Sequence, residues 1–577
     1  LSDFDGWSLG LSATGEESGD GAWYGFGANV GVGNFTVGGS YGHTEDDYGL
    51  NEDGQDLDAF DVGVSYAIDA ASVSLSYGYE DFGTGDVQAV DLGLAYELGA
   101  GVAWQSSVFW FDQKNDTDPD NDGYSDVPEI AKFNFNPKLF YYPNNKTEVY
   151  LGALVSKETR MGGDMLLIDD READSVNYFF DKQKTNRYTT QFSLKHDLSS
   201  DNKLTLKNSI SSFNRFIRIR ENILGETTEF GGQQLNSFSE LNYNLSKPKQ
   251  VLNIGFNFIT DRFKEDEFNN DQLRDQEYVT FGGYINQLWN ISDKLALESG
   301  LRTDYVKANS LISESDGEAF ILPRLSALYK INTNLSLRLG GGMGYRMPTI
   351  FSEEAEPYGY KNIEAIDFKN VTAERSYGGN VDLKYQSTFG SDNVLLTLNQ
   401  MFFYNIIDNP IALIYYFNGF YINTGGSVNG NDINSQGFES QIKLTVWKFT
   451  WFLGYTYTTA VLKSYFYSDL ILTPKHSIKG DLLFVEDDKW RIGWDYEYKS
   501  EQILSSGLKS PSLFTTGIVV ERTLGNFVIF LNAENFTDAR QTRHESMLSG
   551  PYNTPQFTDV WAPMDGFFFN AGFKIKL

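Results

Sequence analysis

The acidic stretch DTDPDNDGYSDVPE, residues 116–129, has oxygen-bearing residues at a spacing that could hold a calcium ion. Ca²⁺ takes about six to eight oxygen ligands, and a loop supplies them from alternating positions around a glycine that permits a sharp turn. Gly123 is that glycine. The predicted ligands are five side chains and the carbonyl of Tyr124: Asp118, Asp120, Asp122, Tyr124, Asp126 and Glu129.

Calcium is the one cofactor that the sequence suggests, and its role would be to order the loop. Loops of this spacing normally join two helices, whereas the flanking segments 104–111 and 132–142 alternate as strands. The alternative interpretation is an acidic surface loop that is solvated by water and mobile counterions.

Catalysis has little support in the sequence. There is no Cys, and the four His residues show no paired metal spacing. Ser and Thr lack a visible base constellation that would activate them as nucleophiles. We therefore expect no enzyme activity and predict no catalytic residue.

Two further segments could bind a ligand. In GYRMPTIFSEEAEPYGY (344–360) the candidates are Tyr345 and Arg346, although the segment could equally be a structural strand exit, because Pro348 removes a ladder donor. The loop 410–423 is unusually aromatic for an exposed segment, so it could bind a ligand or a surface lipoprotein, or pack on neighbouring loops. Its candidate residues are Tyr415, Tyr416, Phe417, Phe420 and Tyr421.

The elements that must position these residues are strands. In FDVGVSYAI (60–68) every second residue is apolar and its neighbours are small or polar, and the same alternation recurs to FFFNAGFKIKL (567–577). Short turn-forming links alternate with long links along the chain, which is typical of a transmembrane β-barrel. We predict an all-β fold: a large antiparallel barrel of about 22–26 strands, with short periplasmic turns and long extracellular loops.

No stretch of the sequence is apolar enough over its length for a membrane-spanning helix, and the N-terminus LSDFDGWSLG lacks the features of a signal peptide. We therefore expect a mature chain, from which a signal peptide is absent, in the outer membrane of a Gram-negative bacterium. A barrel exposes only every second residue to lipid, which explains a mean hydropathy of −0.36 in a membrane protein. Outer-membrane lipid is then one partner.

Charge divides the chain sharply. Residues 1–113 contain no Lys or Arg, but they hold 20 acidic residues and 21 of the 55 Gly. The net charge of −32 excludes nucleic acid as a partner, because phosphate would be repelled. We predict two parts that together form one closed barrel, residues 1–113 and residues 114–577, which meet at the acidic loop.

The second part resembles the barrel of TonB-dependent outer-membrane receptors, especially those of Bacteroidetes type. The residues that carry the resemblance span about 116–577 and include DPDNDGYSDVPE, FNFNPKLFYYPNNKTEVYLG (133–152), LRLGGGMGYRMPTIFSEEAE (337–356) and LNAENFTDARQTR (531–543). The first part resembles a general porin of alphaproteobacterial type, as in FDVGVSYAIDAASVSLSYGYED (60–81).

The receptor resemblance implies a transport protein that binds a small-molecule nutrient or chelate at its extracellular loops and passes it through the barrel. No segment of this sequence resembles the plug domain or the energy-coupling segment of such receptors, so a separate plug or TonB system would be a partner. The alternative is a passive, plugless wide pore, whether porin-like, engineered or chimeric. A soluble β-protein is a third possibility, and the ligand is not identified.

Overall fold

The computed structural model describes most of the chain. The described residues are 6–16, 22–45, 57–81, 85–114, 123–125, 127–170, 179–220, 227–268, 273–351, 355–356, 360, 363–390, 394–416, 419–424, 432–463, 468–549, 555–564 and 566–576.

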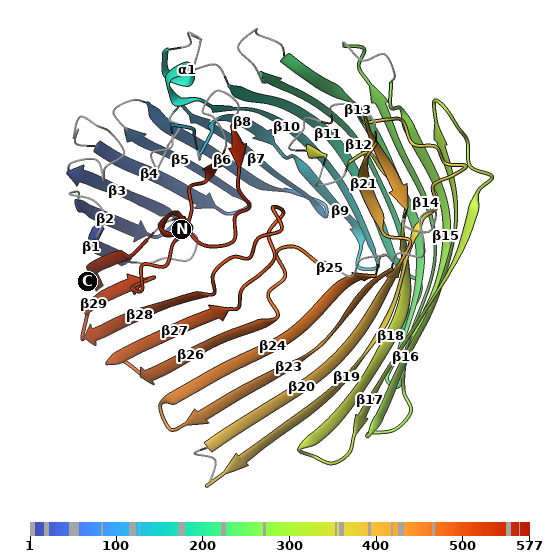
Figure 1. Cartoon of the computed structure of the whole chain (residues 1–577). Helices are drawn as coiled ribbons and strands as arrows, with labels where there is room; N and C mark the ends of the chain where they lie inside the picture. Colours follow the sequence, from blue (N-terminus) through green and yellow to red (C-terminus); the bar gives the residue numbers. More distant parts are fainter. Residues whose placement is uncertain are drawn as a thin grey trace.

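Antiparallel strands make up nearly all of this structure (Figure 1). The first half holds β1 (Gly6–Glu16), β2 (Ala22–Val32), β3 (Phe35–Glu45), β4 (Leu57–Ile68), β5 (Ala71–Asp81), β6 (Asp86–Gly99), β7 (Val102–Gln113), β8 (Glu129–Phe135), β9 (Lys138–Asn144), β10 (Thr147–Gly163), β11 (Phe180–Asp197), β12 (Asn202–Arg220), β13 (Thr227–Lys247), β14 (Gln250–Glu265), β15 (Gln276–Asn290) and β16 (Leu295–Ser310). The second half holds β17 (Glu318–Lys330), β18 (Leu335–Arg346), β19 (Glu374–Phe389), β20 (Val394–Asp408), β21 (Ile411–Tyr416), β22 (Gly419–Thr424), β23 (Asp432–Val446), β24 (Phe449–Lys463), β25 (Ser468–Asp469), β26 (His476–Glu486), β27 (Trp490–Lys499), β28 (Leu513–Leu524), β29 (Phe527–Glu534), β30 (Leu548–Ser549), β31 (Gln556–Phe557) and β32 (Phe568–Lys576). Two short helices, α1 (Met165–Asp170) and the 3₁₀ turn at Gln541–Arg543, lie in loops. No helix among the described residues is long and apolar enough to cross a membrane.

The wall closes on itself. Neighbouring strands pair in chain order, and β1 pairs with β32, from Ser8 opposite Lys576 to Glu16 opposite Phe568. The described residues place 28 strands in this sheet, but β8 with β9, and β25 with β26, each share one position in the wall, which leaves 26 positions. The predicted all-β barrel is confirmed. Closure is required because unpaired backbone groups cost several kcal/mol each in hydrocarbon.

The two parts of different composition join without a break in the ladder. β7 is the last strand of the Lys- and Arg-free part, and it pairs with both β8 and β9, as β10 does on their other side. β8 and β9 are one wall strand interrupted at Asn136 and Pro137, where Pro has no N–H for the ladder. Seven wall strands therefore precede this seam.

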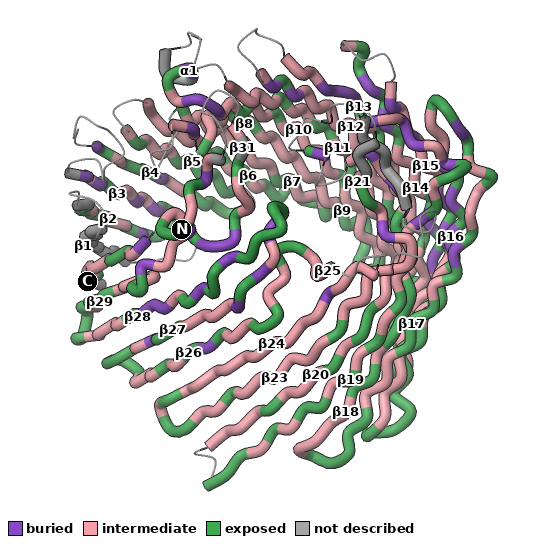
Figure 2. The backbone as a smooth tube through the Cα atoms, in the orientation of Figure 1, coloured by how far each residue is buried: buried purple, intermediate pink, exposed green. Residues whose placement is uncertain are grey.

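Alternation assigns each side chain to a face of the wall. On β15, Phe281 is 57% exposed and Ile285 is 44% exposed, and both face outward. Tyr284 lies between them and faces inward, where its hydroxyl accepts a hydrogen bond from Asn242 Nδ2 at 2.9 Å. Figure 2 shows the wall strands as alternating exposed and intermediate positions, whereas buried positions gather near one rim. The outward apolar residues form the lipid-facing surface.

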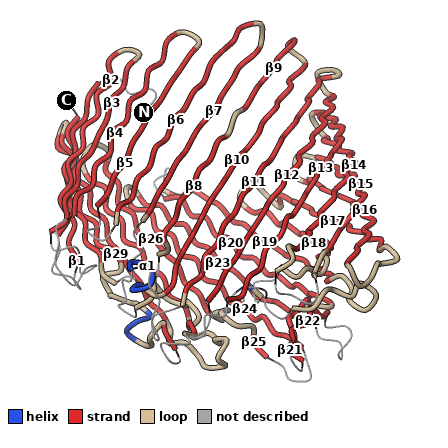
Figure 3. The backbone as a smooth tube through the Cα atoms, turned by 90° about the horizontal axis from the view of Figure 1, so that it is seen from above, coloured by secondary structure: helices blue, strands red, loops and turns tan. Residues whose placement is uncertain are grey.

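The two rims of the barrel differ. Tight turns such as the one between β2 and β3 join strands at one rim, and the long links, with α1, lie at the other (Figure 3). β1 begins, and β32 ends, at the short-turn rim, because both are antiparallel neighbours in a closed wall. The alternation of link lengths in the sequence therefore gave the correct rims.

The assignment of faces predicts different costs for a charge at adjacent positions of β5. Leu75 is 46% exposed on the outer face, and Ser76 faces the lumen opposite Asp91 of β6. Leu75→Arg should lower the free energy of unfolding by about 2–4 kcal/mol, because the guanidinium must enter hydrocarbon, whereas Ser76→Arg should change it by less than about 1 kcal/mol. Urea unfolding in lipid vesicles measures both, and equal effects would contradict the assignment.

Candidate ligand site at the mouth of the barrel

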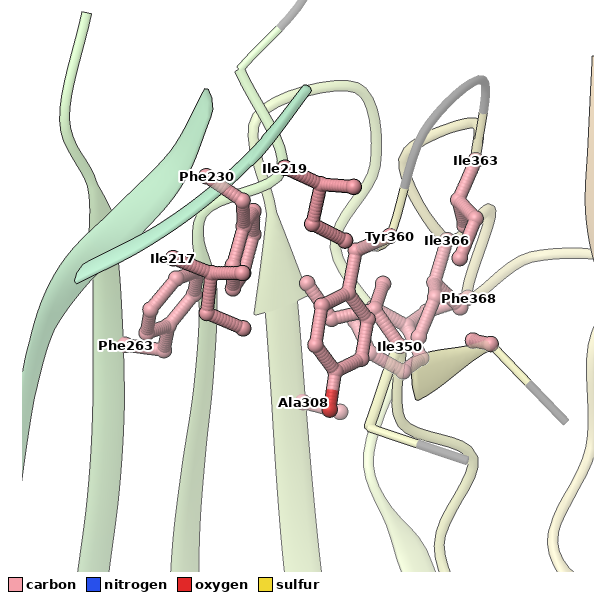
Figure 4. Close-up of a cluster of buried hydrophobic side chains, with 11 residues drawn as sticks. Ile217, Ile219, Phe230, Phe263, Ala308, Ile350, Tyr360, Ile363, Ile366 and Phe368 are labelled. Atoms are coloured by element: carbon pink, nitrogen blue, oxygen red, sulfur yellow. The ribbon is translucent and has the colours of Figure 1, made fainter. Parts of the chain in front are cut away.

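The long link between β18 and β19 folds inward and covers the wall. Its residues Ile350, Ile366 and Phe368 are buried against the lumen-facing ends of β12, β13, β14 and β16 (Figure 4). Each such apolar side chain contributes about 1.5–3 kcal/mol when it is fully buried. We call this cluster the loop core, and its buried members are Ile217, Ile219, Phe230, Phe263, Ala308, Ile350, Ala355, Tyr360, Ile363, Ile366 and Phe368.

A buried ion pair fastens this link to the wall. The side chains of Arg274 and Glu265 are 3% and 0% exposed, and Nε of Arg274 donates to Glu265 Oε2 at 2.9 Å. The guanidinium also donates to the carbonyl of Tyr360 and lies 5.1 Å from the ring centre of Phe230. Burial raises the pKa of Tyr360, so its hydroxyl stays neutral. Three groups from three segments, the Glu265 carboxylate, the Tyr360 carbonyl and the Phe230 ring, thus surround one cation.

A second folded loop lies on the other side of the mouth, between β29 and β32. Gln541 is fully buried at its centre, where Nε2 donates to the carbonyl of Asp559 at 2.7 Å and Oε1 accepts from the Trp561 amide at 2.9 Å. Trp561 packs with Leu504 and Leu513. Because each hydrogen bond of the buried amide is satisfied within the loop, this segment has a defined shape.

Three aromatic rings join the two sides. Tyr124, 3% exposed, contacts Phe179 at a ring-centre distance of 5.9 Å and Phe557 at 5.6 Å, both edge to face. Phe179 packs against the loop core, and Phe557 belongs to the loop before β32. We call these rings the aromatic bridge. The loop before β32 therefore reaches past the ends of β1–β7 toward β8, as the red segment in Figure 1 shows.

Below the loop core, four cations face the lumen on β8, β10, β11 and β12: Lys132, Arg160, Arg187 and Arg215, which we call the lumen quartet. Glu158 accepts from Arg160 at 2.6 Å and from Lys132 at 3.1 Å. Arg215 donates to Gln183 Oε1 at 2.8 Å and pairs with Glu356. The register places these residues in adjacent rows, with Glu158 opposite Lys132 and Thr185 opposite Arg215.

Arg187 differs from the other three cations. It is exposed to the lumen, it lies 4.8 Å from the ring centre of Phe213, and it forms no ion pair within the described residues. A guanidinium stacked on a ring keeps its N–H groups available for a ligand. The lumen quartet is a cationic surface in a chain whose net charge is −32, so it can attract an anionic ligand.

The structure places the predicted ligand residues as follows. Tyr345 is enclosed in the wall, with its ring stacked on Phe320 at 3.8 Å and its hydroxyl donating to Asp304 at 3.0 Å, and Arg346 is exposed beside it. The aromatic segment predicted to be a loop is a hairpin, β21–β22, because Tyr415 pairs with Phe420 and Ile414 with Tyr421. Tyr416 ends β21, and Phe417 lies outside the described residues.

The calcium prediction is only partly described. Asp118, Asp120, Asp122 and Asp126 lie outside the described residues, and no cluster of acidic or His residues elsewhere in the described chain could hold a metal. Gly123 has φ +88°, a left-handed conformation that favours glycine in a sharp turn. Tyr124 bridges Asp164, which is fully buried, and Glu129 begins β8.

Sequence reasoning missed the groups that shape the mouth. Arg274, Glu265 and Gln541 come from segments with no recognisable motif, and no spacing within the chain joins Arg274 to the carbonyl of Tyr360, 86 residues away. For the lumen quartet, the sequence held one signal, the period-two alternation of β11 and β12. This alternation places Arg187 on the opposite face from the outward Tyr188.

Comparisons with known proteins agree with this architecture. The family model for the TonB dependent receptor-like beta-barrel matches residues 130–536, and the model for Gram-negative porins matches residues 2–116. No curated protein matches the sequence. The FrpB iron transporter from Neisseria meningitidis (F3-3 variant) is 14% identical with a TM-score of 0.57, covering 100% of this chain and 82% of that one. The siderophore receptor PirA from Acinetobacter baumannii is 16% identical with a TM-score of 0.57, covering 93% and 85%. The ferric citrate transporter FecA is 12% identical with a TM-score of 0.58, covering 99% and 79%. At these identities the likeness shows the fold.

The buried ion pair predicts a local effect of mutation. Arg274→Met removes the cation that faces the buried Glu265 carboxylate, which should destabilise the docked link by about 3–5 kcal/mol. Hydrogen exchange of the amides in 363–371 should rise accordingly, while exchange in the wall stays unchanged. The double variant Arg274→Met with Glu265→Leu should recover most of the loss.

A matched control is the pair between Arg375 and Glu318, whose side chains are 47% and 32% exposed. Arg375→Gln should cost less than about 1 kcal/mol, because water screens an exposed pair. If the two arginine variants loosen the link equally, the ion pair with Glu265 does not hold it.

Proposed function

Because the chain belongs to the TonB-dependent receptor-like β-barrel family and transports a nutrient across the outer membrane, we propose that its ligand is an anionic metal chelate that binds at the extracellular mouth. The long-loop rim is then the extracellular one. FrpB is named an iron transporter, PirA a siderophore receptor and FecA a ferric citrate transporter. These names support a metal chelate as the class of ligand.

The observation that carries the proposal is the exposed guanidinium of Arg187 on the Phe213 ring, inside the lumen quartet. Carboxylate, catecholate or hydroxamate oxygens of a chelate would accept charge-assisted hydrogen bonds from Arg187, Arg160 and Lys132. An aromatic group of the ligand would extend the stack on Phe213. The loop core above the quartet and the aromatic bridge beside it would limit escape of the bound chelate.

The adjacent arc of the wall, β1–β7, contributes a contrasting field. β1–β7 carry no Lys or Arg, and Asp61 and Asp91 face the lumen there. An anionic chelate would be repelled from this arc and drawn toward β8–β12, which orients it as it enters. The proposed site therefore lies on the receptor-like part of the wall, next to the seam.

Binding of ferric citrate, measured by calorimetry on the detergent-purified chain, tests the proposal. Arg187→Gln should weaken binding by about 10- to 100-fold, because a charge-assisted hydrogen bond contributes about 1.5–3 kcal/mol. The control Lys384→Gln removes an exposed cation from β19, across the lumen, and should change affinity by less than about threefold. A second probe, a ferric catecholate, covers chelates that carry aromatic groups.

Conductance separates this proposal from the passive-pore alternative. In a planar bilayer, a large ohmic current that neither probe chelate reduces, together with no saturable binding, would show that the chain acts as a pore and would contradict the proposal.

We further propose that the acidic loop binds calcium and that the ion orders the seam. The left-handed Gly123 fits the turn that such a loop needs, and the fully buried Asp164 lies across a β-bridge from Tyr124. The Cα atoms of cross-strand residues in such a bridge lie about 4.5–5.5 Å apart, so Asp164 is a close neighbour of Tyr124. The ligands would be Asp118, Asp120, Asp122, Asp126, Glu129 and the Tyr124 carbonyl.

Calcium removal should loosen this loop and leave the barrel intact. With Ca²⁺ at several mM, limited proteolysis within 114–128 should slow by about tenfold relative to the chelator-treated chain, because extracellular calcium modules bind with Kd of about 0.1–1 mM. The double variant Asp120→Asn with Asp122→Asn should abolish the protection. The control Asp487→Asn, in a turn at the opposite rim, should retain it. Equal cleavage with and without Ca²⁺ would refute the calcium proposal.

A further inference from the structure

The outer face of β11 and β12 carries a cluster of three cations, of which only Arg218 forms an ion pair within the described residues. Lys182 and Arg218 are cross-strand partners, and Lys184 is two residues from Lys182 on the same face. These three residues are the outer patch. They face outward, because Ile217 and Ile219 on either side of Arg218 are buried in the loop core inside the barrel.

The outer patch has more positive than negative charge among its described neighbours. Like charges directly opposite each other in a sheet destabilise it, and here Lys182 stands opposite Arg218. The one ion pair in the patch joins Arg218 to Glu229 of β13. Lys182 and Lys184 form no ion pair within the described residues, although Asp266 lies nearby on the outer face beside Gly231. An external anion would relieve the repulsion.

The height of the outer patch shows which anion can reach it. Tyr188, 43% exposed, lies on the same face of β11, four residues closer to the short-turn rim than Lys184. Exposed aromatic residues mark the membrane interface, and four residues of strand span about 13 Å. With the tilt of barrel strands, Lys184 lies about 10 Å above that level, and its long side chain can reach back toward the headgroups.

We propose that the outer patch binds the phosphate groups of phosphorylated glycolipid in the outer leaflet. The patch is continuous with the lipid-facing surface below it. Its positive charge is complementary to phosphate, whereas the first part of the chain is acidic. The outer faces of β1–β7 have no Lys or Arg at any height. The lipid would therefore bind the receptor-like part of the barrel. Its site would be on the outer face of the same strands whose inner face carries Arg187 and Arg215.

Titration of the detergent-purified chain with fluorescent bis-phosphorylated lipid A tests this inference. Each Lys or Arg near an anionic surface contributes about fivefold, so Lys182→Gln with Lys184→Gln and Arg218→Gln should weaken binding by about 100-fold. The double variant Lys182→Gln with Lys184→Gln keeps the Arg218–Glu229 pair and should lose about 30-fold. The control Lys146→Gln with Lys247→Gln and Lys249→Gln makes the same charge change at the short-turn rim and should bind as the wild type does.

Two further arms decide the source of the phosphate. Dephosphorylated lipid A should bind the wild type at least tenfold more weakly than the bis-phosphorylated form, and 10 mM inorganic phosphate should not displace the latter. The inference is overturned if the triple variant binds as the wild type does, if removal of the phosphates has no effect, or if inorganic phosphate displaces the lipid.

Discussion

The pairing of β1 with β32 is the constraint on which the rest of the structure depends. Lipid offers no hydrogen bonds, so an open edge at this point would leave a row of N–H and C=O groups unsatisfied at several kcal/mol each. The ladder from Ser8–Lys576 to Glu16–Phe568 joins the first porin-like strand to the last receptor-like strand. The ladder of β7 with β8 and β9 makes the other joint. The two parts of different composition can therefore form one wall, because the strands at both joints pair by continuous backbone hydrogen bonds.

Two of the long links fold back over the lumen of the wide barrel. The loop core and the folded loop before β32 are separate packed units, and the aromatic bridge joins them near Tyr124. Buried polar groups give these links their shape: Arg274 with Glu265 in one, and Gln541 in the other. Such groups are costly when unpaired, so they favour one conformation of each link over many. The described parts of these two links are thus held in place by buried packing and hydrogen bonds.

Alternation lets one pair of strands serve two environments. On β11 and β12, Arg187 and Arg215 face the lumen, where an anionic chelate would pass. Lys182 and Arg218 lie on the reverse face, nearer to the long-link rim than the exposed Tyr188. The two cationic surfaces are separated by the thickness of one sheet, and we propose that a chelate binds one and lipid phosphate the other. Neither surface would exist on β1–β7, where no Lys or Arg occurs.

The sequence by itself determined the wall. Period-two apolar residues, such as Phe60, Val62 and Val64, fix which face meets lipid, and turn residues fix the short-turn rim, because both are local properties of the chain. Only the tertiary structure decided the mouth. The aromatic segment at 410–423 forms a hairpin, Tyr345 stacks on Phe320, and Arg274 reaches Tyr360 through contacts between residues far apart in the chain. Such contacts depend on how links pack across a closed barrel, and no spacing along the sequence records that packing.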